Sequence, residues 1–193
     1  MHSGPADLSD HYAWRVGAPE RDNSVAGGEG IAIREAVNDD LAGVLAIYNE
    51  VIAFSTAVFS DQAVTLEDRQ RWLAARREQG YPVLVACDSS GVVGFASFGD
   101  FRAWPGYRYT VEHSVHVRAD RRGEGIGTEL VRALIGRAAA LGKHLMIAGV
   151  EAENAASIRL HERLGFTAAA RFSEVAWKFD RWLDLAFLER RLP

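Results

Sequence analysis

Hydrophobic residues follow first a strand-like and then a helix-like period soon after residue 30. Ile31 and Ile33 alternate with polar neighbours, as in a half-buried strand. Asn38-Asp39-Asp40 then provides helix-capping residues. Behind this cap, six apolar residues share one helical face: Leu41, Val44, Leu45, Tyr48, Val51 and Ile52. A second helix is indicated by Thr65 and Asp68, which resemble a capping box with Asp in place of Glu.

The rest of the chain alternates between β-rich runs and helical periods. Residues 82–87 and 92–101 flank the turn-forming residues 88–91 and predict a hairpin, and residues 108–117 predict a third strand. A Gly-rich turn follows. The helical face after it is formed by Leu130, Val131, Leu134, Ile135, Ala138 and Leu141.

The last part of the chain completes the predicted fold. Residues 144–150 predict a strand, Asn154 caps a helix that continues through Leu164, and residues 167–192 are β-rich again. The order is strand, helix, helix, three strands, helix, strand, helix, strands. It predicts an α/β sandwich with a mixed, largely antiparallel sheet.

Composition limits the class of protein. With 193 residues, of which 48% are hydrophobic and 25% charged, the chain can form one sizeable core. Its net charge of -4 is not gathered into blocks, so it predicts no nucleic-acid or membrane partner and favours a small molecule or peptide. Neither a membrane span nor a signal peptide is indicated. The only cysteine, Cys87, is interpreted as a buried strand thiol, and we predict a cytoplasmic location.

Residues 1–30 differ from the rest of the chain. They are rich in Gly and Pro, have no sustained apolar period, and contain five acidic residues against two basic ones. We predict that they form a flexible extension and that residues 31–193 form a single domain.

The Gly-rich turn carries the strongest chemical signal. It reads Arg122-Gly123-Glu124-Gly125-Ile126-Gly127-Thr128 and lies between a strand and a helix. Glycines there let the backbone approach an anion, and free helix N–H groups point toward it. A P-loop would need Lys after Gly127, and a dinucleotide fingerprint would need Gly at Thr128 or Leu130. Spacing alone leaves two interpretations, a pyrophosphate site or a turn without a ligand.

The surrounding sequence distinguishes between these interpretations. Five stretches resemble the GNAT superfamily of N-acetyltransferases and, within it, the phosphinothricin and methionine sulfone N-acetyltransferase group. They are residues 81–85, 94–100, 109–117, 151–166 and 178–185. The resemblance implies a GNAT-type sheet flanked by helices on both faces, acetyl-CoA as co-substrate, and a homodimer.

The same resemblance assigns the cofactor-binding residues. It implies that main-chain groups of Val115, His116 and Val117 bind the pantetheine arm. Arg122 and residues 123–128 bind the pyrophosphate, and Asn154 reaches the arm of the cofactor. As a helix N-cap, Asn154 also has a purely structural explanation.

Acetyl transfer from a thioester to an amine needs a neutral amine, donors for the oxyanion, and a proton for the departing thiolate. Glu112 is the candidate base, since a carboxylate within an apolar strand needs a reason; an ion-paired surface residue is the alternative. Backbone N–H groups near residues 115–117 are the candidate oxyanion donors. For the thiolate, His161 occupies the position where many GNAT enzymes have Tyr, with water or a structural histidine as alternatives.

The acceptor site is assigned by resemblance to the turn before Glu112. The substrate-binding residues are then Pro105, Gly106, Tyr107, Arg108 and Glu112. Arg108, and less strongly Arg102, are candidate donors for an acceptor carboxylate. Phe54, Thr56 and Phe59 lie where a loop could close over the acceptor, although core packing explains both Phe residues equally well.

A metal site is not expected. His113 and His116 are an odd number of residues apart on a strand, so they should point to opposite faces. The predicted function is therefore metal-free transfer of acetyl from acetyl-CoA to the α-amino group of a small amino acid analogue. Phosphinothricin, methionine sulfone and methionine sulfoximine are the expected types. The alternatives are a protein or peptide N-terminus or a polyamine as acceptor, or a non-catalytic acyl-CoA-binding module, against which Glu112 argues.

Overall fold

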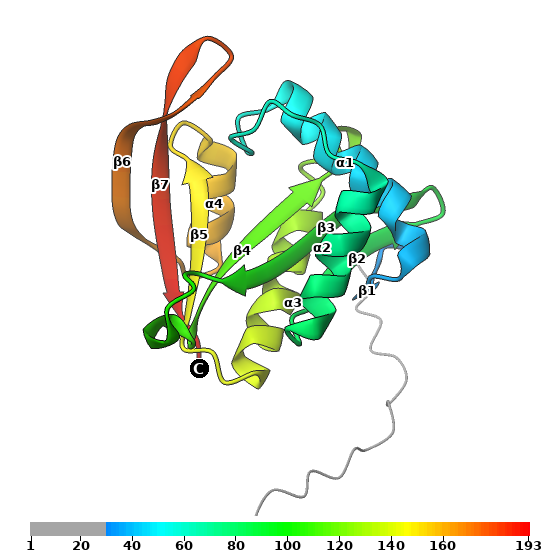
Figure 1. The fold of residues 1–193 in the computed structure, drawn as a ribbon, viewed down its shortest axis with the longest axis horizontal. Helices are drawn as coiled ribbons and strands as arrows, with labels where there is room; N and C mark the ends of the chain where they lie inside the picture. Colours follow the sequence, from blue (N-terminus) through cyan, green and yellow to red (C-terminus); the bar gives the residue numbers. More distant parts are fainter. Residues whose placement is uncertain (1–29) are drawn as a thin grey trace, which may run out of the picture.

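A computed structural model describes residues 30–193, so nearly all of the predicted extension, residues 1–30, lies outside the described residues. Its elements are β1 (Ala32–Glu35), α1 (Leu41–Phe54), α2 (Leu66–Glu78), β2 (Val83–Asp88), β3 (Gly91–Asp100), β4 (Thr110–Val117), α3 (Ile126–Ala140), β5 (Leu145–Glu151), α4 (Ala155–Arg163), β6 (Thr167–Lys178) and β7 (Arg181–Arg191). Each predicted helix and strand is present (Figure 1).

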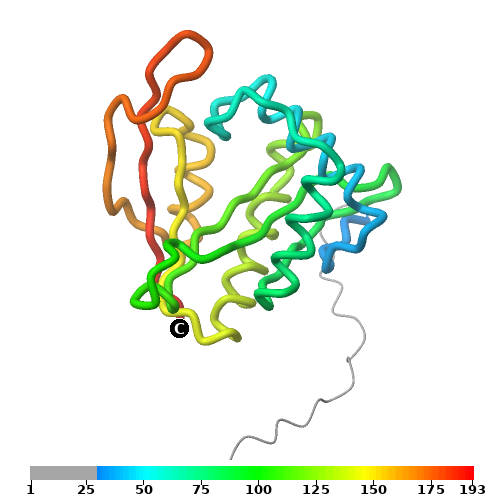
Figure 2. The backbone as a smooth tube through the Cα atoms, in the orientation of Figure 1, coloured from blue at the N-terminus to red at the C-terminus, as the bar shows by residue number. Residues whose placement is uncertain are grey.

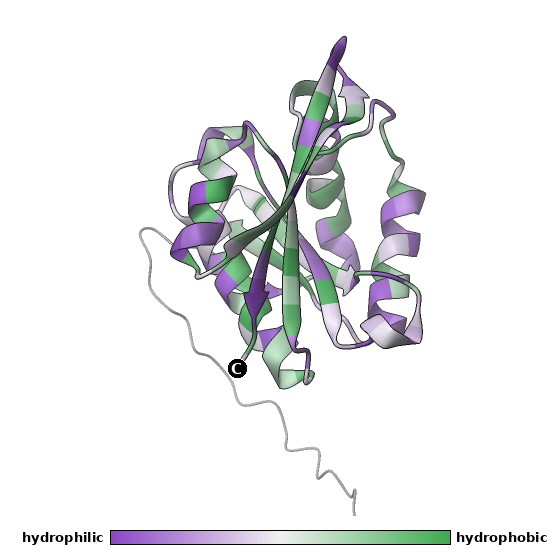
Figure 3. Ribbon diagram, turned by 90° about the vertical axis from the view of Figure 1, so that its left-hand side faces the viewer, coloured by the Kyte–Doolittle hydropathy of each residue, from purple (hydrophilic) through white to green (hydrophobic). Residues whose placement is uncertain are grey.

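The strands form one seven-stranded sheet in the order β1-β2-β3-β4-β5-β7-β6. Only the β4–β5 pair is parallel. Helices α1 and α2 pack on one face, whereas α3 and α4 pack on the other, each pair over its own apolar cluster. Figure 3 shows helices on both sides of the sheet. The predicted mixed, largely antiparallel sheet with helices on both faces is confirmed.

The main apolar cluster lies between the sheet and α3. Leu130, Val131 and Leu134 of α3 are completely buried there, as their helical spacing predicts. The prediction was wrong for Leu141, which is 49% exposed because α3 ends at Ala140 and Leu141 caps it.

Helix α1 corrects a second detail of the pattern. Ile47, which the predicted face omitted, is buried on the α1 side of the sheet, whereas Leu45 is only partly buried. The spacing from Val44 through Ile47 to Val51 follows the helical period more closely than the predicted set did.

Two local features also bear on the sequence analysis. The Thr65–Asp68 capping box is confirmed, with Asp68 N–H donating to Thr65 Oγ1 (3.2 Å) and Thr65 N–H to Asp68 Oδ2 (2.8 Å). Cys87 is not fully buried, contrary to prediction, because it pairs with Ala32 at the start of the short edge strand β1.

Within residues 30–193, no helix is long and apolar enough to cross a membrane. The same residues contain no group of three or more His, Cys, Asp or Glu side chains arranged to hold a metal ion. The expected absence of a metal stays a prediction.

Candidate active site

The central feature of the site is a separation between β4 and β5. These parallel strands pair only from Thr110↔Leu145 to His113↔Ala148, although both continue beyond that point. Their outer edges stay paired, β4 with β3 and β5 with β7. Residues 114–117 therefore face a gap, and their main-chain groups on this edge have no strand partner in the described chain (Figures 1 and 2). Buried main-chain N–H and C=O groups need partners, so this edge is suited to bind an extended ligand.

A cavity occupies this gap. It is lined by Ala57, His113, Ser114, Val115, His116, Ala148, Gly149, Val150, Glu151, Asn154, Ser157 and His161. It thus brings together the predicted pantetheine residues Val115 and His116, Asn154, and the predicted proton donor His161. The predicted acceptor turn and the Gly-rich turn lie outside this lining.

A larger cavity, of about 530 Å³, lies at the start of α1 beside the β2–β3 turn. Arg34, in its wall, is paired with Asp40 at 2.7 Å, and Arg118 is paired with Asp120. These arginines already have acidic partners, and none of the predicted catalytic or cofactor-binding residues lines this cavity. The smaller cavity between β4 and β5 is therefore the candidate active site, although it is not the larger of the two.

The Gly-rich turn follows β4 after a short 3-10 turn, Ala119–Arg121, and leads into α3. Gly123 and Gly125 have φ values of +84° and +87°, in the left-handed region that residues with a side chain rarely adopt. The first main-chain bond of the helix runs from Glu129 N–H to Gly125 C=O (3.1 Å). No acceptor in the described chain pairs with the N–H groups of residues 126–128, which are therefore available to an anion.

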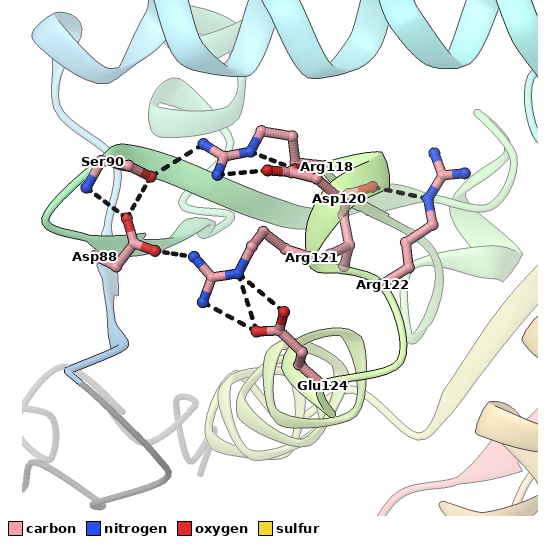
Figure 4. A network of polar contacts seen from close by, with 8 residues as sticks. Asp88, Ser90, Arg118, Asp120, Arg121, Arg122 and Glu124 are labelled. Atoms are coloured by element: carbon pink, nitrogen blue, oxygen red, sulfur yellow. Dashed lines mark hydrogen bonds and ion pairs between the residues drawn. The ribbon is translucent and has the colours of Figure 1, made fainter.

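Charged side chains around this turn are mostly paired with one another (Figure 4). Arg121 pairs with both Asp88 and Glu124, so the Glu124 carboxylate already has a cationic partner. Arg122 Nε donates to Val117 C=O (3.2 Å), and within residues 30–193 it has no acidic partner. Arg122 is thus the guanidinium that the turn leaves free for an anion.

Asn154 combines the two roles that its sequence position allowed. Its Oδ1 accepts a hydrogen bond from Ser157 N–H (3.0 Å), which caps α4. The residue also lines the cavity, and this bond uses only the carbonyl oxygen of its amide. The cap therefore leaves the amide NH₂ able to donate to a ligand.

Glu112 lies on the face of the sheet that carries α1 and α2. It is partly buried, and no salt bridge of residues 30–193 includes it. Burial raises the pKa of Glu112, an effect partly opposed by the charge of Arg102. A Cβ at position 149 would lie 3.0 Å from Glu112 Oε1. Because Gly149 has no side chain, the Glu112 carboxylate has room to lie against it, beside the cavity.

The predicted acceptor turn lies at the start of β4, on the 3-10 turn Pro105–Tyr107. It is linked to Glu112 through aromatic rings: Tyr107 packs on Phe101 (5.8 Å between centroids), and Phe101 packs on Phe187 (6.2 Å). The Phe187 ring in turn lies 3.5 Å from where a Gly149 Cβ would be. The turn and Glu112 thus border the same aromatic surface.

Both candidate arginines for the acceptor are held locally. Arg102 Nη1 donates to Phe101 C=O (2.7 Å) with its guanidinium 4.0 Å above that ring, and Arg108 Nη1 donates to Pro105 C=O (3.1 Å). Arg102 is the one whose charge acts on Glu112, although the sequence ranked it below Arg108.

His113 and His161 form a buried pair in the cavity wall. His161 Nδ1–H donates to Ser157 C=O (2.7 Å), so its Nε2 is an acceptor and must receive the Nε2–H of His113 (3.2 Å). His116 points to the opposite face and packs on Phe95, as expected from the strand period. Both nitrogens of His161 are therefore engaged.

Three functional candidates were missed from the sequence. Glu151, 5% exposed, accepts from Thr56 Oγ1 (3.1 Å) in the cavity wall. Lys178, 4% exposed, donates to the loop after α1. Arg69 lies 4.4 Å from the Tyr48 ring centroid, and its buried Nε has no partner in the described residues. Glu151 and Lys178 each begin a stretch that resembles the GNAT superfamily, which was an available signal, whereas nothing in the sequence singles out Arg69.

With fold and site in place, comparison with known proteins identifies the family. The acetyltransferase (GNAT) family matches residues 44–166, and the chain belongs to this family. It is 52% identical over 162 residues to an L-methionine sulfoximine/L-methionine sulfone acetyltransferase of Pseudomonas paraeruginosa, covering 83% of this chain and 94% of that protein. The resemblance to GNAT N-acetyltransferases inferred from the sequence is confirmed.

Two further similarities support this result. A phosphinothricin N-acetyltransferase of Streptomyces coelicolor is 36% identical over 165 residues, covering 84% of this chain and 96% of that protein. A Salmonella typhimurium acetyltransferase, solved with its cofactor acetyl-CoA, superposes with a TM-score of 0.83 at 46% identity, covering 86% of this chain and 95% of that one.

The histidine pair predicts how stability depends on pH. Burial lowers the pKa of His161 and holds that of His113 at about 3, whereas a histidine in an unfolded chain titrates near pH ~6.5. Below pH ~6.5 the unfolded chain therefore binds more protons at these two histidines than the folded protein does. The free energy of unfolding falls as the pH drops from ~6.5 toward the folded-state pKa values, by up to about 1.4 kcal/mol per pH unit for each histidine.

Replacing His113 by Phe is expected to flatten this dependence, measured by urea unfolding from pH 7 to pH 4. His144→Gln, at an exposed histidine, is the control and should keep the wild-type slope. An unchanged slope in His113→Phe would show that the pair is not neutral in the folded protein.

Proposed function

We propose that this protein transfers acetyl from acetyl-CoA to the α-amino group of a small amino acid analogue of the methionine sulfoximine, methionine sulfone or phosphinothricin type. The observation that carries the proposal is a partly buried, unpaired Glu112 beside the gap between β4 and β5, which leads to the Gly-rich turn. The names of the relatives support this acceptor class.

Acetyl-CoA fits the groups that the chain offers. The open edge at Val115–Val117 provides main-chain partners for the amides of the pantetheine arm, and Asn154 offers its NH₂ group. The free N–H groups at the start of α3, together with Arg122, suit the pyrophosphate. Acetyl-CoA supplies the activated acetyl group.

The acceptor fits the opposite end of β4. Arg102, beside Glu112, offers a charge to the acceptor carboxylate, and Phe101 and Phe187 provide apolar surface for its side chain. Pro105, Gly106, Tyr107 and Arg108 border this surface and stay proposed contacts.

The chemistry then follows from the positions of these groups. Glu112 takes a proton from the acceptor ammonium, directly or through water, because its raised pKa makes it a better base than an exposed Glu. Main-chain N–H groups of residues 115–117 stabilise the negative charge that develops on the carbonyl oxygen. As the amine forms its bond to carbon and the C–S bond breaks, the thiolate needs a proton, for which His161 and water are the candidates.

The function is tested by incubating the protein with acetyl-CoA and each of the three amines while thiol release is measured. Turnover is expected with at least one, and with none of them the acceptor proposal fails. Peptide and polyamine acceptors test the alternatives.

Glu112→Gln should bind acetyl-CoA normally but lose roughly 10²- to 10⁴-fold in kcat, the contribution typical of a general base. Full activity in this variant would exclude Glu112 as the base.

His161 is proposed as the proton donor, and its geometry defines the test. Its ring lines the cavity, but its neutral form predominates at pH 7 and both nitrogens are bonded, so donation requires one bond to open. If His161 is the donor, His161→Phe should lower kcat by about 100-fold with an unchanged KM for acetyl-CoA. A loss of less than about threefold would assign the proton to water.

Arg122 separates cofactor binding from chemistry. Arg122→Gln should raise the KM for acetyl-CoA by about tenfold, the effect of losing one charged hydrogen bond, with little change in kcat. Arg132→Gln is the matched control, since Arg132 lies on the exposed side of α3 and pairs with Glu129. Equal effects of the two substitutions would show that Arg122 has no specific role at the phosphates.

We also propose a homodimer in the cytoplasm. Phe172, Trp177, Phe179 and Trp182 are each about half exposed on the β6–β7 hairpin, which projects from the sheet (Figure 1). Exposed clustered aromatics are typical of protein interfaces. Light scattering should give twice the chain mass of 21.2 kDa, and Trp182→Ser should shift it toward a single chain. A wild-type mass of one chain would exclude the dimer.

A further inference from the structure

Lys178 is a buried lysine whose bonds are all to main chain. Its Nζ donates to Ser55 C=O (2.7 Å) and to Val58 C=O (2.8 Å), about 120 residues earlier in the chain. No salt bridge of the described residues includes it. Burying an ammonium group is costly unless such bonds compensate. These two bonds therefore determine where the Lys178 side chain can lie.

The carbonyls belong to residues 55–58, the closing loop, which directly follows α1. A second contact holds the same loop, because Thr56 Oγ1 donates to Glu151 Oε2 (3.1 Å). Between these ties, Ala57 contributes to the wall of the cavity that contains Ser114 and Gly149. The closing loop is thus held against the cavity from two strands, β5 and β6.

Apolar packing does not hold this loop. None of residues 53–60 is buried, and Phe54 is 83% exposed, which excludes core packing as the explanation for this residue. The position of the closing loop therefore depends on the polar ties from Lys178 and Glu151. Loops held by few contacts open easily, so losing a tie should change the loop before it changes the fold.

We propose that Lys178 is a positioning residue that holds the closing loop over the reacting end of the cavity. By keeping Ala57 in the wall of the cavity, it excludes water from the place proposed for the thioester, where Gly149 lies beside Glu112. Lys178 touches neither substrate and acts only through the loop. The proposal rests on the proposed acetyl transfer for its catalytic consequence, but not for the tether itself.

The test compares Lys178→Met, which keeps the chain length but removes the donors, with Lys178→Arg, which keeps them. In Lys178→Met, hydrogen exchange at residues 55–58 should accelerate about tenfold or more, and kcat/KM for the acceptor should fall by a similar factor. Binding of acetyl-CoA alone should stay within about twofold, because the open edge of β4 and the Gly-rich turn are untouched. Lys178→Arg should restore most of the acceptor kinetics.

Arg77→Met is the matched control, since Arg77 Nη2 also donates to a main-chain carbonyl, that of Ala36 (2.9 Å), remote from the cavity. The double variant Lys178→Met/Thr56→Val should lower kcat/KM for the acceptor by less than the product of the two single-variant factors, because both substitutions release the same loop.

Unchanged exchange at residues 55–58 in Lys178→Met would overturn the tether. Acceptor kinetics no worse than those of Arg77→Met would overturn the positioning role. Failure of the wild type to acetylate any amine would instead refute the proposed function. The exchange measurement would still show whether Lys178 holds residues 55–58 in place. Should Lys178→Met not fold, Lys178→Gln, which has a shorter and uncharged side chain, carries the same measurements with the same expected outcomes.

Discussion

The site depends on one constraint, that β4 and β5 pair over only four residues and then separate while their outer neighbours stay paired. An unpaired edge inside a sheet leaves main-chain groups that need partners, and here the opening is lined by the loop after α1 and by the first residues of α4. The segment after β4 passes through a 3-10 turn and the Gly-rich turn into α3, so the open edge and the free helix N–H groups belong to one stretch of chain. The proposed cofactor site therefore relies on main-chain groups more than on charged side chains.

The charged groups near the site differ in their surroundings more than in their chemistry. Glu112 stands beside an aromatic surface, where burial raises its pKa, whereas Glu151, in the same cavity region, is held by Thr56 and by the Glu153 N–H group. Glu112 therefore has no salt-bridge partner among the described residues, whereas Glu151 is bonded to the loop after α1. The buried histidine pair behaves as a neutral part of the wall.

Local sequence signals predicted most of the fold, and they located the Gly-rich turn; its role and that of residues 115–117 in cofactor binding stay predictions. Helical period, capping residues and the spacing of glycines act within a few residues, which is why the strands, the helices and the Gly-rich turn could be located in advance. The Lys178, Glu151 and His113 contacts join residues separated by 120, 95 and 48 positions, and no local pattern records such pairs. Leu141 fitted the helical period yet is exposed, because the period does not say where a helix ends.

The β2–β3 turn shows how a residue distant in sequence fixes a charge beside the Gly-rich turn. Asp88 ends β2, yet it pairs with Arg121, which also pairs with Glu124 of the Gly-rich turn. Two carboxylates thus share the Arg121 guanidinium, whereas the neighbouring Arg122 has no acidic partner among residues 30–193. The hairpin therefore takes part in deciding which of two adjacent positive charges stays unpaired.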